Sequence, residues 1–208
     1  MLMAPSLANR SLANQPTAIE TLRDATSTIH LRLHAHPAFA QLQGGDISRA
    51  AYVHLLTALY GFHGAFRGVA AEGPARCLRL ADDLTFLGVS LEQIARMPLA
   101  AAPGTQGHVA RWGIDYVLRG ASLGGRVLAR NLDHLLDPGR IDGRRFFMEN
   151  GAKPGSNWRG FLQQIEQALP TITDRRTACE AAVATFEKFE VWMSRAMSPL
   201  TQGRAIDE

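Results

Sequence analysis

The chain of 208 residues is long enough for one domain with a substantial core and short for two. It is 46% hydrophobic and 20% charged with a net charge of +3, an ordinary globular composition, and no apolar run reaches the roughly 18 residues of a membrane-spanning helix. The arginines are dispersed, so we expect no nucleic-acid partner. Without a membrane-spanning run or a secretory signal, we expect no membrane association and a cytoplasmic location as the default.

The chain begins with a segment that lacks the continuous apolar run and the cleavage site of a secretory signal, and we expect a disordered arm over residues 1–16. The first helix should open at Thr17, because Glu20 stands three positions later and completes a capping box. Pro37 should end this helix. Its expected apolar face has helical spacing and consists of Ile19, Leu22, Ala25, Ile29 and Leu33.

The rest of the chain also has helical periodicity, and no alternating stretch predicts a strand. Glycine and proline should interrupt it near residues 100–106 and 153–156. We expect an all-α domain of six to eight helices over residues 17–198, followed by a frayed tail over 199–208. The further helices are predicted at about 46–67, 77–86, 108–136, 157–169 and 174–197, with a short one capped by Ser90 and Gln93.

Three glycines, Gly120, Gly124 and Gly125, stand among strong helix formers. In a helix interior each costs about 0.8–1 kcal/mol relative to alanine, against a typical total stability of about 5–15 kcal/mol. Glycine lets a backbone approach another surface closely. That surface can be a neighbouring helix or a flat ligand, and the residues alone leave both alternatives open.

His30 falls beside Ile29 on the expected apolar stripe of the first helix, where a lone histidine is most often a core residue. Arg23, two turns upstream on the same side, favours an anionic ligand. Haem offers an iron to the imidazole and two propionates to the guanidinium. His34 has the spacing at which two histidines share a metal ion, but no glutamate accompanies the pair, and a solvated histidine patch near the helix end is the alternative.

Three motifs follow one another along the chain: Leu22-Arg23-Asp24-Ala25-Thr26-x-x-x-His30, Tyr116-Val117-Leu118-x-Gly120-x-x-Leu123-Gly124-Gly125, and Phe146-Phe147-x-x-x-Gly151-x-x-x-Gly155-x-x-Trp158-Arg159-x-Phe161. In this order they resemble the opening helix, the distal helix and the following segment of bacterial biliverdin-producing haem oxygenases, especially those that serve bacteriophytochromes. The resemblance spreads over about residues 17–196. It implies a single-domain haem-oxygenase-like helical bundle with haem between the first and the distal helices.

The resemblance also implies roles for individual residues. His30 would be the proximal ligand of the iron. The catalytic distal segment would bring the backbone of Gly120, Ala121, Gly124 and Gly125 against the haem face. The remaining haem-binding residues would be Arg23, Thr26, Tyr116 and Arg159, with the two arginines near the propionates.

Four positions depart from the family pattern. His34 stands where many relatives have glutamate, and Ala121 stands where the animal enzymes have an aspartate that organises water. Bacterial members commonly lack this aspartate, so we expect a different oxygen-activating network. Asn150 replaces an aromatic residue and Gln163 a basic one.

The activity that the resemblance implies is oxidative cleavage of haem to biliverdin, CO and free iron. Haem b would be both cofactor and substrate, used with O₂ and electrons from an external donor. Because the chain has no nucleotide-binding glycine motif after a strand, we expect a separate ferredoxin or reductase as donor. The resemblance implies a bacteriophytochrome as the candidate biliverdin acceptor. The alternatives are a non-degrading haem carrier or sensor of the same fold, and a helical relative without haem, such as a thiamin-degrading or cofactor-maturing enzyme.

Overall fold

The structure, a computed structural model, describes residues 16–101, 104, 107–148 and 154–198. Within these ranges the regular secondary structure is entirely helical. The helices are α2 (Ala18–His34), η1 (Pro37–Phe39), α3 (Ala40–Gly44), α4 (Arg49–Ala65), α5 (Gly73–Phe86), α6 (Leu91–Ala95), α7 (His108–Gly120), η2 (Ala121–Gly124), α8 (Gly125–Arg130), α9 (Pro154–Ala168) and α10 (Ile172–Ala196).

The expected all-α, single-domain class is confirmed. The nine α-helices in the described ranges exceed the six to eight expected, because three of them have only five or six residues. The expected arm lies almost wholly outside the described residues, as does the tail from residue 199. Over the same ranges, none of the helices has both the length and the hydropathy that a bilayer crossing requires.

The start of α2 is the predicted one. The Thr17 hydroxyl accepts the Glu20 N–H at 3.1 Å, and the Glu20 carboxylate accepts the Thr17 N–H at 2.8 Å, so both halves of the capping box are present. The buried face differs from the expected one, because Ala25 is exposed and Thr26 is buried. The buried residues of α2 are Ala18, Leu22, Thr26, Ile29 and Leu33.

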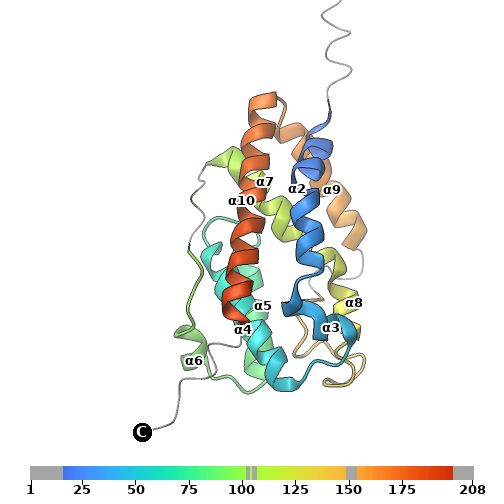
Figure 1. Cartoon of the computed structure of the whole chain (residues 1–208), viewed down its shortest axis with the longest axis vertical. Coiled ribbons are helices and arrows are strands. Elements are labelled where there is room, and N and C mark those ends of the chain that lie inside the picture. The colour runs from blue at the N-terminus through green and yellow to red at the C-terminus, as the bar shows by residue number, and fades with distance from the viewer. Residues whose placement is uncertain (1–15, 102–103, 105–106, 149–153, 199–208) are drawn as a thin grey trace, which may run out of the picture.

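The helices pack around α10, the longest of them. Figure 1 shows α2 and α7 along its upper part and α4 along its lower part, with α5 against α4 and α9 beside α2. Gly113 makes the close contact of α7 with α10 possible, because a Cβ atom there would overlap the carbonyl group of Ala178. The apolar stripe of α4 belongs to the core, because all of its members are buried: Tyr52, Leu55, Leu56, Leu59, Phe62 and Phe66.

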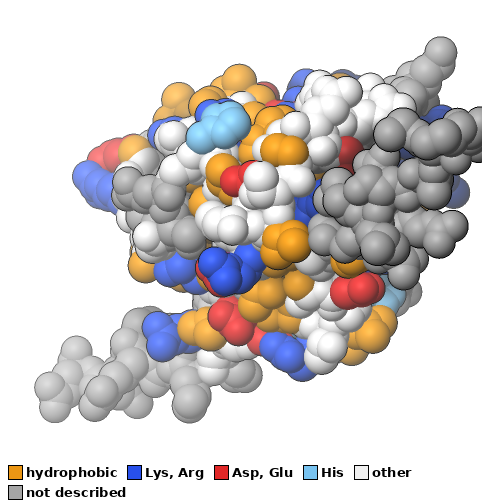
Figure 2. Space-filling model, turned by 90° about the horizontal axis from the view of Figure 1, so that it is seen from above, with side chains coloured by type: hydrophobic (Ala, Val, Ile, Leu, Met, Phe, Trp, Pro, Cys, Tyr) orange, Lys and Arg blue, Asp and Glu red, His pale blue; other side chains and the backbone are white. Residues whose placement is uncertain are grey.

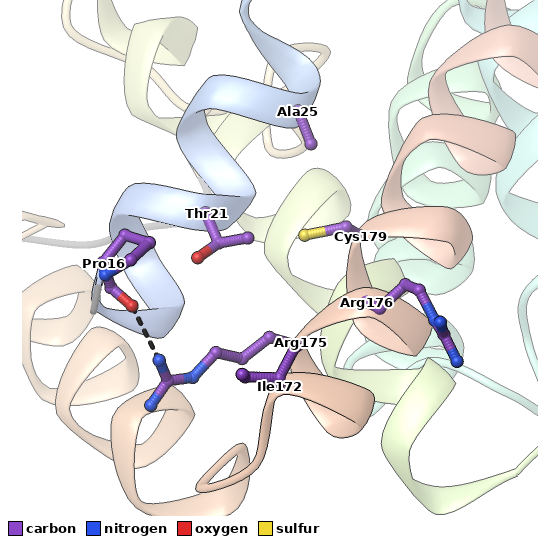
Figure 3. A pocket seen from close by; sticks show the side chains of 7 residues that line it. All are labelled: Pro16, Thr21, Ala25, Ile172, Arg175, Arg176 and Cys179. Carbon is purple, nitrogen blue, oxygen red and sulfur yellow. Dashed lines mark hydrogen bonds between the residues drawn. The ribbon is translucent and has the colours of Figure 1, made fainter. Parts of the chain in front are cut away.

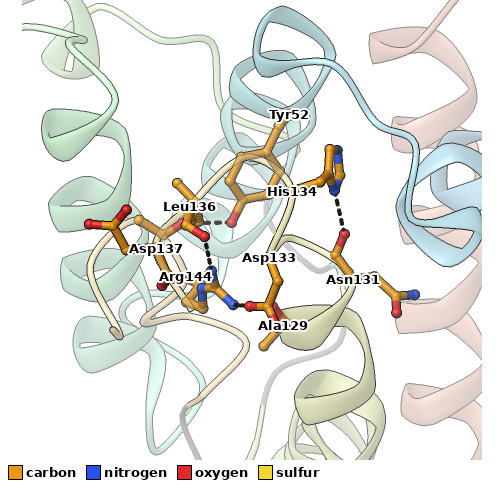
Figure 4. Close-up of polar contacts among 9 residues, drawn as sticks. Tyr52, Ala129, Asn131, Asp133, His134, Leu136, Asp137 and Arg144 are labelled. Atoms are coloured by element: carbon orange, nitrogen blue, oxygen red, sulfur yellow. Dashed lines mark hydrogen bonds and ion pairs between the residues drawn. The ribbon is translucent and has the colours of Figure 1, made fainter. Parts of the chain in front are cut away.

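The single helix predicted over residues 108–136 is wrong. It divides into α7, η2 and α8, and the chain after Arg130 continues in turns to residue 148. Buried Arg144 holds this irregular stretch together by donating to the carbonyl oxygens of Ala129 and Leu136 at 2.6 and 3.1 Å (Figure 4). The Tyr52 hydroxyl donates to the Gly143 carbonyl at 2.7 Å and ties the stretch to α4.

The interruption predicted at residues 153–156 is also wrong for the part that the structure describes. Pro154 is the first residue of α9, a position where proline loses no helical hydrogen bond. Lys153 lies outside the described residues.

Candidate functional site

The imidazole of His30 lies on the flank of α2 rather than on its buried stripe. The expectation that it is buried among apolar residues is wrong, because His30 is exposed and a helical step of about 100° carries it from Ile29 past the edge of the stripe. Its ring meets the buried Phe186 of α10 edge-on, with 6.1 Å between ring centroids. Arg23 and His34, also exposed, follow the same flank.

Tyr116 of α7 reaches the same side of α2. Burial raises the pKa of its phenol, while a hydrogen bond with Thr26 and the charge of Arg23 act in the opposite direction. The Thr26 hydroxyl also donates to the Leu22 carbonyl at 2.7 Å, which fixes its orientation on the helix. The structure therefore brings together three residues expected around the ligand: Arg23, Thr26 and Tyr116.

α9 completes this group with Trp158, whose ring lies 5.6 Å from that of Tyr116. Trp158 also faces the end of α7, because its ring edge would lie 3.5 Å from a Cβ atom on Gly120. Arg159, the next residue, is exposed on the same helix. Trp158 and Phe186 were not among the expected site residues. Trp158 stands in the third sequence motif, whereas the packing of Phe186 on His30 has no counterpart in the sequence.

The three glycines occupy a break between helices rather than a helix interior. Gly120 ends α7, Gly124 ends η2 and Gly125 begins α8, so the helix-interior cost expected for them does not apply. Gly125 is buried, and a Cβ atom on it would overlap the carbonyl oxygen of Phe147. Close packing within the protein therefore explains Gly125.

Gly124 has a different environment. None of the described atoms would lie within 4 Å of a Cβ atom on Gly124, and Ala121, Leu123 and Gly124 are all exposed. The backbone at Gly124 thus borders open space, and the start of the break, Gly120, faces Trp158.

Similarity to known proteins bears on this arrangement. No protein-family model matches the chain. A protein named "Heme oxygenase" from Xanthomonas campestris pv. campestris (strain 8004) is 32% identical over 120 residues, which are 58% of this chain and 68% of that protein. The chain belongs to the haem oxygenase family.

A crystal structure is similar to this chain at the level of the fold. It is a domain of unknown function with a haem oxygenase-like fold from Shewanella denitrificans, which superposes with a TM-score of 0.67 over 99% of both chains at 13% identity. The expected fold family is confirmed.

A groove of about 390 Å³ lies on the other flank of α2, between the starts of α2 and α10 (Figure 3). Thr21 and Ala25 line it from α2, and Arg175 crosses it to donate to the Pro16 carbonyl at 2.6 Å. None of the expected site residues is among the residues that line it. This groove is separate from the candidate site.

The distribution of charged side chains on the surface does not locate the site. On the face of the molecule seen in Figure 2, basic and acidic side chains of the described residues alternate with hydrophobic ones, without a broad patch of either sign. Within the described ranges, no group of three histidine, cysteine, aspartate or glutamate side chains could hold a metal ion. A protein-only metal site on His30 and His34 would therefore lack a third such ligand there.

Proposed function

We propose that this protein is a biliverdin-producing haem oxygenase that binds haem between α2 and the break at residues 120–125. One arrangement carries the proposal: Arg23 and Thr26 of α2 meet Tyr116 of α7. Trp158, which contacts Tyr116, faces Gly120 at the start of the glycine break. The family relationship implies haem as the substrate class.

The chemistry of these groups fits haem. Imidazole is a common axial ligand of haem iron, and guanidinium forms forked hydrogen bonds with carboxylates. Arg23 would serve one propionate and Arg159 is the candidate for the other. Glycine at Gly124 leaves space that a Cβ atom would fill, so a flat ring can reach the backbone itself.

Haem, once bound, supplies the iron that activates O₂ and the ring that is opened to biliverdin with release of CO and iron. The chain's own residues bind and orient it. His30, held against Phe186 at 6.1 Å, would fix the proximal side. Because burial raises the pKa of Tyr116, its hydroxyl keeps its proton at neutral pH and can donate to a carboxylate.

Ala121 offers no side-chain proton donor, so proton delivery would depend on backbone groups and water along residues 120–125. The electrons would come from a separate ferredoxin or reductase. The sequence motifs also favour the type of enzyme that serves a bacteriophytochrome as biliverdin acceptor, with the catalytic domain over residues 17–198. A non-degrading carrier or sensor is the competing function.

A haemin titration followed by reduction tests the proposal. The wild-type protein, His30→Ala and the matched control His34→Ala are titrated with haemin, and ascorbate is added under air. We expect a Soret band that saturates at one haem per chain, weakened or shifted only in His30→Ala, and then its replacement by biliverdin absorbance. Stable haem without loss of the Soret band would indicate a carrier, and no Soret band would refute haem binding.

A further inference from the structure

α5 carries two ionic side chains that lie inside the protein. Arg76 is 1% exposed and Asp83 is 0% exposed. The two are seven positions apart, about two turns, so both point from the same face of the helix. A buried charge is expensive unless hydrogen bonds compensate it. The partners of these two side chains therefore indicate what they do.

Arg76 contacts the end of α7. Its guanidinium donates to the carbonyl oxygen of Leu118, two residues before Gly120. The last four carbonyl groups of an α-helix lack partners within the helix, and a cation is favourable at that end of the helix dipole. Arg76 thus caps α7 at the point where the bare glycine segment begins.

Asp83 supports the other end of the same segment indirectly, through the turn at residues 145–147. Its carboxylate accepts the backbone N–H groups of Arg145 and Phe146 at 2.8 and 2.9 Å. The next residue, Phe147, places its carbonyl oxygen directly against Gly125, the first residue of α8. The position of α8 is therefore set by a stretch that Asp83 holds.

Residues 120–125, which we call the distal segment, have little other support on their outer side, because Ala121, Leu123 and Gly124 are exposed. We propose that Arg76 and Asp83 are positioning residues that hold the two ends of the distal segment and set how closely its backbone approaches bound haem. The haem part of this inference rests on the proposed function, whereas the anchoring part concerns the protein alone.

Hydrogen exchange of the haem-free full chain tests the anchoring. The variants are Arg76→Met, Arg76→Lys, which keeps a cationic donor, and Asp83→Asn, which keeps one acceptor; the exposed Asp82→Asn is the control. Loss of one charged hydrogen bond should accelerate exchange of the amides of the distal segment about tenfold in Arg76→Met. The amides of the first half of α7 should exchange as in the wild type.

The haem complex supplies a second readout. We expect the C–O stretching band of the ferrous carbonyl complex to shift and broaden in Arg76→Met and Asp83→Asn. The reason is that the distance between the backbone of the distal segment and the bound CO would vary. Arg76→Lys should restore a large part of the wild-type spectrum, and Asp82→Asn all of it. Purely structural destabilisation would lower the thermal midpoint without moving this frequency.

The outcomes separate the two proposals. Unchanged exchange in the distal segment, or equal acceleration over the whole chain, would overturn the positioning role. An unmoved carbonyl frequency would overturn its effect on haem. If Arg76→Met does not fold, Asp83→Asn carries the test, and wild-type exchange and spectrum in that variant would overturn the role. Failure of the wild-type protein to bind haemin would refute the proposed function alone.

Discussion

The carbonyl oxygen of Phe147 packs against the Cα atom of Gly125, closer than any side chain at that position would allow. This contact joins the turn stretch after α8 to the start of α8 itself. One glycine of the break thus has a packing role, while Gly124, one residue earlier, faces open space. The two neighbours can be tested separately.

Gly125→Ala should destabilise the haem-free protein by about 1–3 kcal/mol, because the new methyl group must displace the Phe147 backbone. Chemical denaturation of the apoprotein measures this. The matched control is Gly124→Ala, which should leave the stability of the apoprotein nearly unchanged and instead weaken or alter haemin binding. Equal stability losses in both variants would contradict the distinction between a packing glycine and a ligand-facing one.

The contact between α7 and α10 depends on another glycine. Gly113→Ala should lose about 1–3 kcal/mol of unfolding free energy, since a Cβ atom there overlaps the Ala178 carbonyl. Gly160 in α9 has no described atom within 4 Å of its Cβ position, so Gly160→Ala should gain about 0.5–1 kcal/mol from helix propensity. Thermal midpoints of the two variants should therefore move in opposite directions. A stabilised Gly113→Ala would refute this packing.

Asp83 predicts one pH dependence of stability. Burial raises its pKa to about 6 from the ordinary 3.8, so the folded chain holds this proton more tightly than the unfolded one. The stability of the wild type relative to Asp83→Asn should thus increase as the pH falls from about 6 to 4, by at most about 3 kcal/mol. Urea denaturation of both proteins at each pH measures the difference. A constant difference would contradict the raised pKa.

His63 predicts the opposite dependence. Burial, and to a smaller extent the charge of Arg76, lowers the pKa of its imidazole well below 6.5. Stability from the neutral ring is fully present above pH 6.5 and is lost as the pH falls further. The advantage of the wild type over His63→Phe should therefore shrink between pH 7 and 5. An advantage that grows over this range would show that His63 gains a proton on folding.

Features that depend on local chemistry were predictable from the sequence. The capping boxes of Thr17 and Ser90 are present as expected, since each lies within four residues. The last helix, expected from about residue 174, begins at Ile172, because Thr171 is its N-cap and Asp174 stands at position N3 of the capping box.

Features that depend on packing between distant segments were not predictable. Burial of Arg76 and Asp83 follows from where α5 meets α7 and the turn at residues 145–146. Periodicity on α2 could not distinguish the buried stripe from its flank, so the exposure of His30 was missed. The three glycines indicated a close approach of the backbone in the distal segment, but their spacing fits a helix interior as well as a break between helices.

The most direct test of the account is the CO released when the haem-loaded protein is reduced under air, with catalase present to remove peroxide formed in solution. The account predicts one CO for each haem lost, together with biliverdin, in the wild-type protein and a large loss of both products in His30→Ala. Haem that binds and is reduced without releasing CO would contradict it and leave a haem-binding protein that does not open the ring.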